Sequence, residues 1–314
     1  MKNSKKIALL FPGQGSQYPG MGRDFYDSYA MVREIFEEAN DILGRNLSDI
    51  ILNGPEDVLT QTKNSQTGIF VMSFALLRAV QEAFPNLKPD YTAGLSLGEY
   101  TALSAAEMLP FSECLPLVQD RGTFMNDACE STPGTMAVVL GLSADEIESI
   151  VQSVDMPNDL WAANFNCPGQ VVISGTVKGI EAGTDAAKKK GAKRVLPLPV
   201  HGAFHSGLMK EAEVRLAPHI EKAPITQGQS KLVMNVTGSL VEDISSIKNN
   251  LIHQVTHSVR WEQGIRDLMS RGVELFIEIG CGQSLSGFNK RIGVPVPTIN
   301  IEKPEHLEKL AEYF

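Results

Sequence analysis

Residues 91–108 read YTAGLSLGEYTALSAAEM. The first five, 91–95, have the β-rich apolar character of a buried strand, and 97–108 follow a helical pattern. A G-x-S-x-G pentapeptide joins the two, and its glycines permit the sharp strand-to-helix turn called a nucleophile elbow. Such a turn lifts the Ser96 hydroxyl to the carboxyl end of the strand and places the Leu97 N–H beside the reacting carbon as an oxyanion donor. The segment therefore predicts an α/β fold with a nucleophilic serine; a plain Gly-Ser turn is the alternative.

The rest of the chain continues the alternation of short β-rich runs and helical patterns, which is typical of an α/β fold with a partly parallel sheet. The pattern predicts further strands at Ile7–Phe11, Leu232–Val236, Leu275–Ile279 and Val296–Ile299. It predicts helices at Tyr29–Leu43, Gly68–Ala83, Phe111–Ala128 and Gln263–Arg271.

The middle of the chain follows a different order, β-α-β-β-α-β, which is the ferredoxin-like signature. Its first helix begins at a capping box in which Ser143 is the N-cap and Glu146 stands three residues later. The remaining elements are predicted at Thr135–Gly141, Leu160–Phe165, Gln170–Ser174, Val177–Lys190 and Arg194–Val200. We therefore expect a small ferredoxin-like subdomain at 131–201, inserted into a large α/β hydrolase-like subdomain made of 1–130 and 202–314.

The composition excludes several classes of protein. The 314 residues carry 28 Lys and Arg against 37 Asp and Glu, a formal net charge of −9, whereas a nucleic-acid partner requires a basic face. The longest apolar run, Ile69–Leu77, falls short of the ~20 residues that cross a bilayer, so no membrane partner is expected. Pro12 interrupts the run Ile7–Phe11 before it reaches signal-peptide length, and the four cysteines are widely scattered. We expect a cytoplasmic protein, and we take it to be a monomer.

The loop after the first strand reads FPGQGSQ, residues 11–17. The glycines on either side of Gln14 free its backbone N–H to point into a site, as a second oxyanion donor must, although a tight turn alone would also explain them. The run is not G-x-G-x-x-G, since Tyr18 stands where the third glycine belongs, and it lacks the lysine of a P-loop. Nucleotide binding is therefore rejected, and no cofactor is predicted.

Five separated motifs together resemble the malonyl-CoA:acyl carrier protein transacylases over nearly the whole chain. They are FPGQGSQ at 11–17, GLSLGEY at 94–100, QDRG at 119–122 with Met125, GAFHS at 202–206 with Leu208-Met209, and EIGCG at 278–282. The resemblance implies an acyltransferase of fatty-acid biosynthesis, with polyketide synthesis as the alternative. Such an enzyme passes a malonyl group from malonyl-CoA through a serine ester to the phosphopantetheine thiol of acyl carrier protein, by a ping-pong mechanism.

The resemblance also assigns the catalytic partners of the serine. His205 occupies the family's F-H-x-x-L-M position and is the expected base, with His201 as its rival because spacing alone does not separate them. Gln254 lies in a segment similar to the family's Q-x-x-x-P-V-x-W, where a main-chain carbonyl or side chain holds the histidine. A neutral group in that position makes a milder base than a carboxylate would, which suffices for an activated thioester.

Substrate choice is assigned in the same way. The resemblance places Arg121 at the inner end of the pocket, beside Met125, where its guanidinium can grip the free carboxylate of a malonyl group. Phe204 resembles the malonyl-selecting form of a specificity motif, in which a bulky ring discourages a methyl branch on the α-carbon. A surface arginine and a core phenylalanine are the ordinary alternatives.

Charged clusters and histidine pairs suggest further sites. The resemblance favours Lys290 and Arg291 for contact with the acidic carrier. A second basic cluster spans 188–194, and it could meet CoA phosphates or the carrier, or lie on a solvated face. The pairs His201/His205 and His253/His257 have helical spacing for a metal, but no third ligand set is evident, so no metal is predicted.

The sequence departs from the family at three places: Leu95 stands before the serine where many relatives have His, His257-Ser258 replaces a usual Asn-Pro or Ser-Pro, and Cys281 replaces a common Pro. None of these removes a catalytic group. The main alternative is a serine esterase or thioesterase of the α/β-hydrolase or patatin-like type, which would share the elbow but not require Arg121. A catalytically idle carrier-binding protein would lack Ser96 or His205, and both are present.

Overall fold

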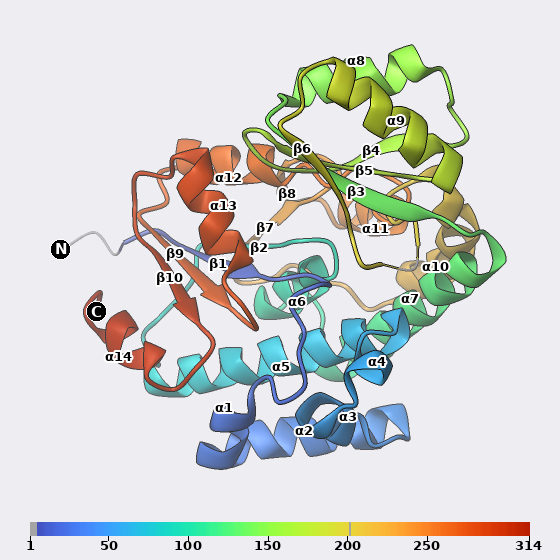
Figure 1. Ribbon diagram of the computed structural model, residues 1–314. Coiled ribbons are helices and arrows are strands. Elements are labelled where there is room, and N and C mark those ends of the chain that lie inside the picture. Colours follow the sequence, from blue (N-terminus) through green and yellow to red (C-terminus); the bar gives the residue numbers. More distant parts are fainter. Residues whose placement is uncertain (1–4, 201) are drawn as a thin grey trace.

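The apolar run Ile7–Phe11 forms strand β1 in the middle of a six-stranded sheet. The computed structural model describes residues 5–200 and 202–314 and orders this sheet β10-β9-β1-β2-β7-β8 (Figure 1). All neighbouring strands pair in parallel except β7 and β8, which are antiparallel. The other strands are β2 (Tyr91–Gly94), β7 (Lys231–Met234), β8 (Ser239–Val241), β9 (Leu275–Ile279) and β10 (Thr298–Ile301).

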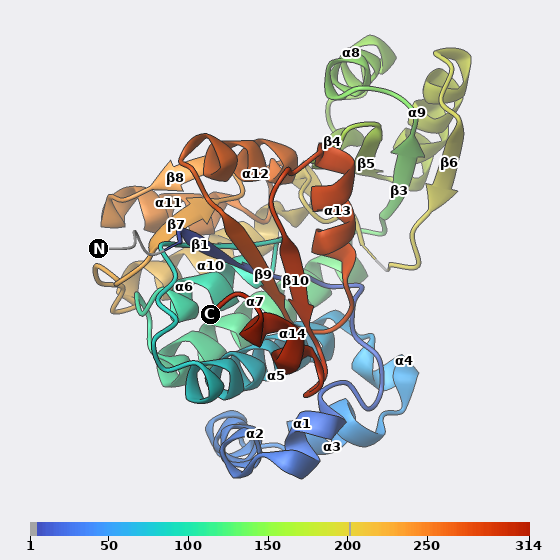
Figure 2. The same ribbon diagram turned by 90° about the vertical axis from the view of Figure 1, so that its left-hand side faces the viewer.

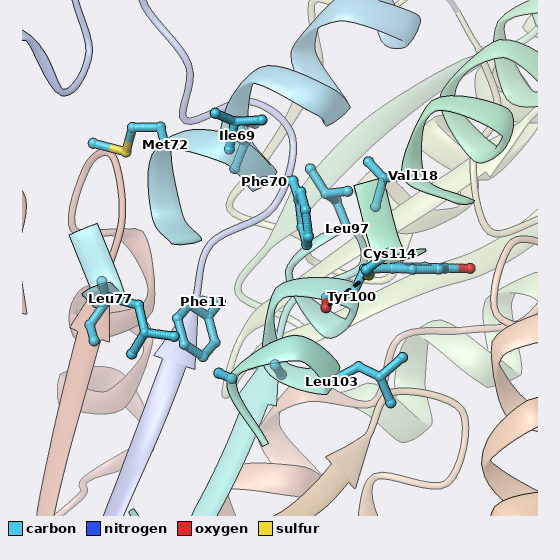
Figure 3. Close-up of a cluster of buried hydrophobic side chains, with 14 of the residues drawn as sticks. Phe11, Ile69, Phe70, Met72, Leu77, Leu97, Tyr100, Leu103, Cys114 and Val118 are labelled. Carbon is cyan, nitrogen blue, oxygen red and sulfur yellow. Dashed lines mark hydrogen bonds between the residues drawn. The ribbon is translucent and has the colours of Figure 1, made fainter. Parts of the chain in front are cut away.

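Both faces of the large sheet are buried, as the fully apolar strand β1 requires. Its odd-numbered residues, including Phe11, pack into a core with helices α5 (Thr62–Ala83), α6 (Gly98–Ala105) and α7 (Phe111–Ser131). Figure 3 shows part of this core, where Leu97 lies beside Phe70 and Tyr100 lies beside Cys114. Its even-numbered residues face a second core with α12 (Trp261–Ser270) and α13 (Ser284–Ile292).

The remaining helices surround this sandwich. Figure 2 shows α1 to α4 as an outer layer on the side of α5. Their bounds are Arg23–Ser28, Ala30–Leu43, Leu47–Asn53 and Glu56–Leu59, followed later in the chain by the 3₁₀ turn η1 (Gly207–Met209) and by α10 (Lys210–Lys222), α11 (Ile244–His253) and α14 (His306–Ala311). Within residues 5–200 and 202–314, none of the helices combines the length and apolarity that a bilayer-spanning segment needs.

The middle of the chain forms a separate antiparallel sheet with strand order β4-β5-β3-β6 and its own core (Figure 1). Its elements follow the predicted order β-α-β-β-α-β: β3 (Thr135–Leu140), α8 (Ala144–Val154), β4 (Leu160–Cys167), β5 (Gln170–Gly175), α9 (Val177–Lys189) and β6 (Arg194–Pro197). The predicted capping box is present, because Ser143 and Glu146 each bond the other's backbone N–H. The fold is therefore mixed α/β with one largely parallel and one antiparallel sheet.

Several predicted boundaries are wrong, and proline explains two of them. The strand predicted at Arg194–Val200 ends at Pro197, and the strand predicted at Val296–Ile299 is Thr298–Ile301, which begins after Pro297. Proline has no N–H for a sheet ladder. Helix α5 begins at Thr62, six residues before the predicted start, because its first turns bury polar side chains that hide the apolar period.

Candidate active site

Ser96 lies on a strained turn between β2 and α6, with a positive φ of 52°. The turn is tight because glycines flank it at both ends. A Cβ at Gly94 would lie 1.9 Å from the carbonyl carbon of Gly98, and one at Gly98 would lie 2.1 Å from the Phe11 oxygen. Side chains at either position would force the strand and the helix apart. The G-x-S-x-G pattern thus produces the elbow geometry that the sequence predicts.

The hydroxyl of Ser96 lies 2.8 Å from Nε2 of His205, which comes from the loop before η1. The other ring nitrogen, Nδ1, lies 2.8 Å from the Gln254 carbonyl oxygen and 3.2 Å from the His257 carbonyl oxygen. Carbonyl oxygens only accept, so Nδ1 must carry the hydrogen and Nε2 is left as the acceptor that faces Ser96. This is the tautomer a general base needs.

The protonation of His205 is set by its surroundings. Its side chain is buried, and burial together with the positive charge of Arg121 lowers the His205 pKa to about 4. The imidazole is therefore neutral across the physiological range and can accept a proton from Ser96. A backbone N–H donated to Val255 (3.0 Å) holds the residue in place at a positive φ of 57°.

Arg121 of α7 lies directly beside the nucleophile, with only 1% of its surface exposed. Its Nη2 donates to the Ser96 hydroxyl (3.1 Å) and to Oε1 of Gln254 (2.8 Å), and Nη1 donates to Oε1 of Gln66. All three acceptors are neutral, and the guanidinium Nε has no partner in the described part of the chain. Burial lowers the Arg121 pKa from its ordinary value. A buried cation held by neutral oxygens is suited to receive a carboxylate from a ligand.

Two side-chain amides hold the peptide groups of Ser96. Asn235, just after β7, accepts the Ser96 N–H (2.7 Å) and donates to the Gly94 oxygen (2.7 Å). The side-chain Nε2 of Gln254 donates to the Ser96 carbonyl oxygen (2.9 Å), while its main-chain carbonyl oxygen accepts from Nδ1 of His205. Sequence reasoning singled out Gln254 but missed Asn235 and Gln66, because no local pattern links either one to a serine so distant in the chain.

One predicted oxyanion donor, Leu97, lies in the elbow itself, and the other, Gln14, lies in the loop after β1 that lines the same cavity as Ser96. The N–H groups of Gln14 and Leu97 have no hydrogen-bond partner among residues 5–200 and 202–314. The Leu97 side chain is fully buried in the core, so only its backbone is available for chemistry. Gly13 brings the Gln14 loop close, because a Cβ there would lie 2.4 Å from the Leu95 carbonyl oxygen.

A cavity of about 220 Å³ opens at Ser96 between the two sheets. The part of the chain around the six-stranded sheet (the large unit) lines it with residues that include Ser96, His205, Gln14, Leu95, Met125 and Phe204. The part around the antiparallel sheet (the small unit) lines it with Met136, Asn164, Asn166, Val172, Leu198 and Val200. The Phe204 ring and the Met125 thioether thus lie in the same cavity as the nucleophile, in a mostly apolar wall. A small acyl group on Ser96 would be enclosed by both units.

The first turns of α13 also line this cavity, through Ser284, Leu285 and Phe288. Its last turn carries Lys290 and Arg291, both exposed. Arg291 additionally donates to the Gln170 side chain at the start of β5. One helix therefore connects the cavity wall to a basic surface, which places the two predicted carrier contacts next to the site.

The histidine pairs have different outcomes. His201 lies outside the described residues, so neither its candidacy as the catalytic base nor its pairing with His205 as a metal ligand is described. His253 and His257 gather with Glu213 of α10, with their ligand atoms within 4.8 Å of one another. Spacing alone did not reveal this third group, since it comes from another helix. Both Glu213 oxygens already accept hydrogen bonds, from Lys210 and from Thr256. The absence of a metal therefore stays a prediction.

Comparisons of sequence and of structure with known proteins all find acyltransferases. The family model described as the acyl transferase domain matches residues 8–285. The chain is 41% identical over 304 residues to the malonyl CoA-acyl carrier protein transacylase of Bacillus subtilis, covering 96% of this chain and 95% of that protein. It superposes with a TM-score of 0.94 on the malonyl CoA-acyl carrier protein transacylase of Coxiella burnetii, at 32% identity and 98% coverage of both chains. A malonyl-transacylase in complex with its type II PKS acyl-carrier protein is equally similar in fold, with a TM-score of 0.94, 35% identity, and 98% and 100% coverage.

Proposed function

The chain belongs to the acyl transferase domain family and, within it, to the malonyl CoA-acyl carrier protein transacylases, and from this premise we propose how its own residues carry out the reaction. The protein is an acyltransferase of fatty-acid biosynthesis that moves a malonyl group from malonyl-CoA to acyl carrier protein. The roles that follow are assigned to the residues around Ser96.

The first half-reaction loads the enzyme. Nε2 of His205 takes the Ser96 proton as Oγ attacks the thioester carbonyl of malonyl-CoA. The resulting oxyanion is stabilised by the N–H groups of Gln14 and Leu97. When the tetrahedral intermediate collapses, the C–S bond breaks and the CoA sulfur receives the proton from His205. The malonyl group is then an ester on Ser96.

The second half-reaction reverses these steps with a different thiol. His205 takes the proton of the carrier's phosphopantetheine thiol as the sulfur attacks the ester carbonyl. A C–S bond forms, the C–O bond to Ser96 breaks, and His205 returns the proton to Ser96 Oγ. Arg121 holds the malonyl carboxylate throughout, and Met125 and Phe204 enclose the acyl group. Enclosure between two structural units disfavours water while the ester waits for the carrier.

One observation supports this assignment above the others: a buried Arg121, which has no carboxylate partner in the described part of the chain, donates to the same Ser96 hydroxyl that faces His205. A serine esterase needs the nucleophile and the base but has no use for a buried cation at the nucleophile. A thioester with a free carboxylate at its far end uses all three groups.

Intact mass spectrometry after mixing with malonyl-CoA tests the proposal. We expect a stable malonyl adduct on the wild-type chain, none on Ser96→Ala, and discharge of the adduct when the carrier's pantetheine thiol is added. Immediate hydrolysis of malonyl-CoA, with no accumulating adduct, would instead favour the esterase alternative.

Further parts of the proposal concern organisation and location. We propose that 131–201 is a ferredoxin-like subdomain, and its strand order β4-β5-β3-β6 supports this. We propose that 1–130 and 202–314 together form a hydrolase-like subdomain, which the largely parallel sheet and the elbow support. We propose that Lys290 and Arg291 contact the carrier, and that the enzyme acts as a cytoplasmic monomer without cofactor or metal. The four buried free cysteines suit a reducing compartment.

A further inference from the structure

Glu99 is a buried carboxylate in the first turn of α6, and the mechanism above does not use it. Its side chain is fully buried, three residues after the nucleophile. One oxygen, Oε1, accepts the backbone N–H of Asn235 (2.6 Å), and the other, Oε2, accepts Nε2 of Gln254 (2.6 Å). Burial of a carboxylate in a core is costly and requires a compensating arrangement of donors.

The two partners of Glu99 are the same two residues that hold Ser96. Asn235 accepts the Ser96 N–H, and Gln254 donates to the Ser96 carbonyl oxygen. The Glu99 carboxylate therefore holds both of the residues that bond the peptide groups of Ser96. Ser96 itself has a strained backbone with a positive φ. Resting on the function proposed above, we propose that Glu99 is a positioning residue that sets the orientation of the Gln254 amide and thereby aligns Ser96 and Arg121 for malonyl loading.

The Gln254 amide has one orientation that matches all of its hydrogen-bond partners. Its NH₂ group faces Glu99 and the Ser96 carbonyl, and its oxygen faces Arg121. An ionised carboxylate only accepts hydrogen bonds, so it permits this orientation and disfavours the flipped one. In the flipped amide, the NH₂ group would face the Arg121 guanidinium, donor against donor, and the amide oxygen would face two acceptors.

Replacing Glu99 by glutamine makes this conflict unavoidable. The Asn235 N–H is a fixed backbone donor and would take the new amide oxygen. The new NH₂ group would then face the NH₂ group of Gln254, and relief would come only from flipping Gln254 toward Arg121. Because removing the Glu99 charge disturbs charge-assisted hydrogen bonds in a buried site, we expect malonyl loading to fall about tenfold or more.

A protonated Glu99 would resemble the glutamine variant, because one oxygen would become a donor. Burial raises the Glu99 pKa to about 8, although the donors from Asn235 and Gln254 and the charge of Arg121 all act to lower it. The charged and titratable groups that face Glu99 are Arg121 of α7 and Tyr100 of α6. Wild-type loading is therefore expected to rise as pH increases through about 8 and Glu99 ionises.

The test measures single-turnover loading of Ser96 by malonyl-CoA between pH 6 and 9, by quenching and intact mass, together with KM. We expect Glu99→Gln to lack the rise near pH 8, so its deficit is tenfold or more at pH 9 and shrinks toward pH 6. Its KM for malonyl-CoA should increase as well, because Arg121 loses its support. Glu99→Asp keeps the charge and should recover part of the loading rate.

Thr92→Val is the matched control. Thr92 is fully buried and donates to the Ala102 oxygen (3.0 Å), so the variant removes a buried hydrogen bond onto the same helix without touching Ser96, Gln254 or Arg121. It should load like the wild type at every pH.

The inference is overturned if Glu99→Gln loads at the wild-type rate, if its loss is the same at all pH values with KM unchanged, or if Thr92→Val loses as much. Should Glu99→Gln fail to fold, Glu99→Asp still decides: its shorter side chain keeps the charge but cannot reach both donors, so loading at the wild-type rate with unchanged KM overturns the inference. A wild-type chain that forms no malonyl adduct at all would refute the proposed function instead.

Discussion

Replacing Arg121 with alanine is the most direct test of substrate choice. In the folded protein, the guanidinium lies beside Ser96 with 1% exposure, and its hydrogen-bond acceptors among the described residues are all neutral. In the variant, the carboxylate of a malonyl group would enter a buried site without a cation. An acetyl group has no such carboxylate, so its transfer loses no ion pair in the variant.

The size of the effect follows from the burial. Removing one partner of a buried ion pair costs about 3–5 kcal/mol, because the other charge is left without compensation. At about 1.4 kcal/mol per factor of ten, kcat/KM for malonyl-CoA should fall by about two to four orders of magnitude. Loss of the partners for Gln66 and Gln254 will also lower stability, by about 1–3 kcal/mol for each unsatisfied group.

The assay compares malonyl-CoA and acetyl-CoA loading of Ser96 on the same preparation, so that any loss of folded enzyme cancels in the ratio. Arg45→Ala is the control. Arg45 is half-buried and donates to Asn64 (2.8 Å) and Thr67 (3.1 Å) of α5, and neither of these hydrogen bonds involves Ser96 or Arg121. Only Arg121→Ala should shift the ratio toward acetyl. An unchanged malonyl preference would refute the role given to Arg121.

Three further predictions test other parts of the site. Phe204→Ala should raise methylmalonyl loading relative to malonyl by about 10- to 100-fold in a competition assay, since a single methyl excluded by packing is worth ~1–3 kcal/mol; an unchanged ratio would contradict the steric role. Lys290→Glu should raise KM for the carrier and weaken its salt dependence while leaving malonyl-CoA loading unchanged; its control is Lys88→Glu, an exposed lysine before β2, at the opposite end of that strand from Ser96. In a plot of loading rate against pH, the decline that reports protonation of His205 should have its midpoint near pH 4, because the lowered His205 pKa keeps the imidazole neutral above that value. A midpoint near 6.5 would contradict the burial effect.

The elements predicted best from sequence were those whose physical cause is local. The capping box at Ser143 and the glycine-flanked turn at Ser96 depend on residues within a few positions, and the structure contains both. The start of α5 was predicted wrongly because its first turns bury polar side chains such as Gln66, which tertiary contacts accommodate. Local patterns carry no information about such partners.

The contacts that organise the site are instead long-range. Asn235 lies 139 residues from Ser96, and Gln254 lies 158 residues from it. No periodicity predicts that these amides meet at one peptide. Family resemblance supplied Gln254 and Arg121 as candidates, and it implied that a main-chain carbonyl or a side chain near Gln254 holds His205. Asn235 required coordinates, because an asparagine after a strand is an ordinary loop residue by sequence.

The neutral support of His205 is consistent with the charge of the substrate. A carboxylate on Nδ1, as in a Ser-His-Asp triad, would strengthen the base but would add a negative charge close to Arg121. That charge would pair with the guanidinium and compete with the malonyl carboxylate for it. The main-chain carbonyls of Gln254 and His257 orient the ring without this competition. The one carboxylate in the network, Glu99, is instead occupied by two N–H donors, and Gln254 separates it from Arg121. A weaker base is sufficient because a thiolate is a good leaving group, so the site keeps its cation free for the acyl group it selects.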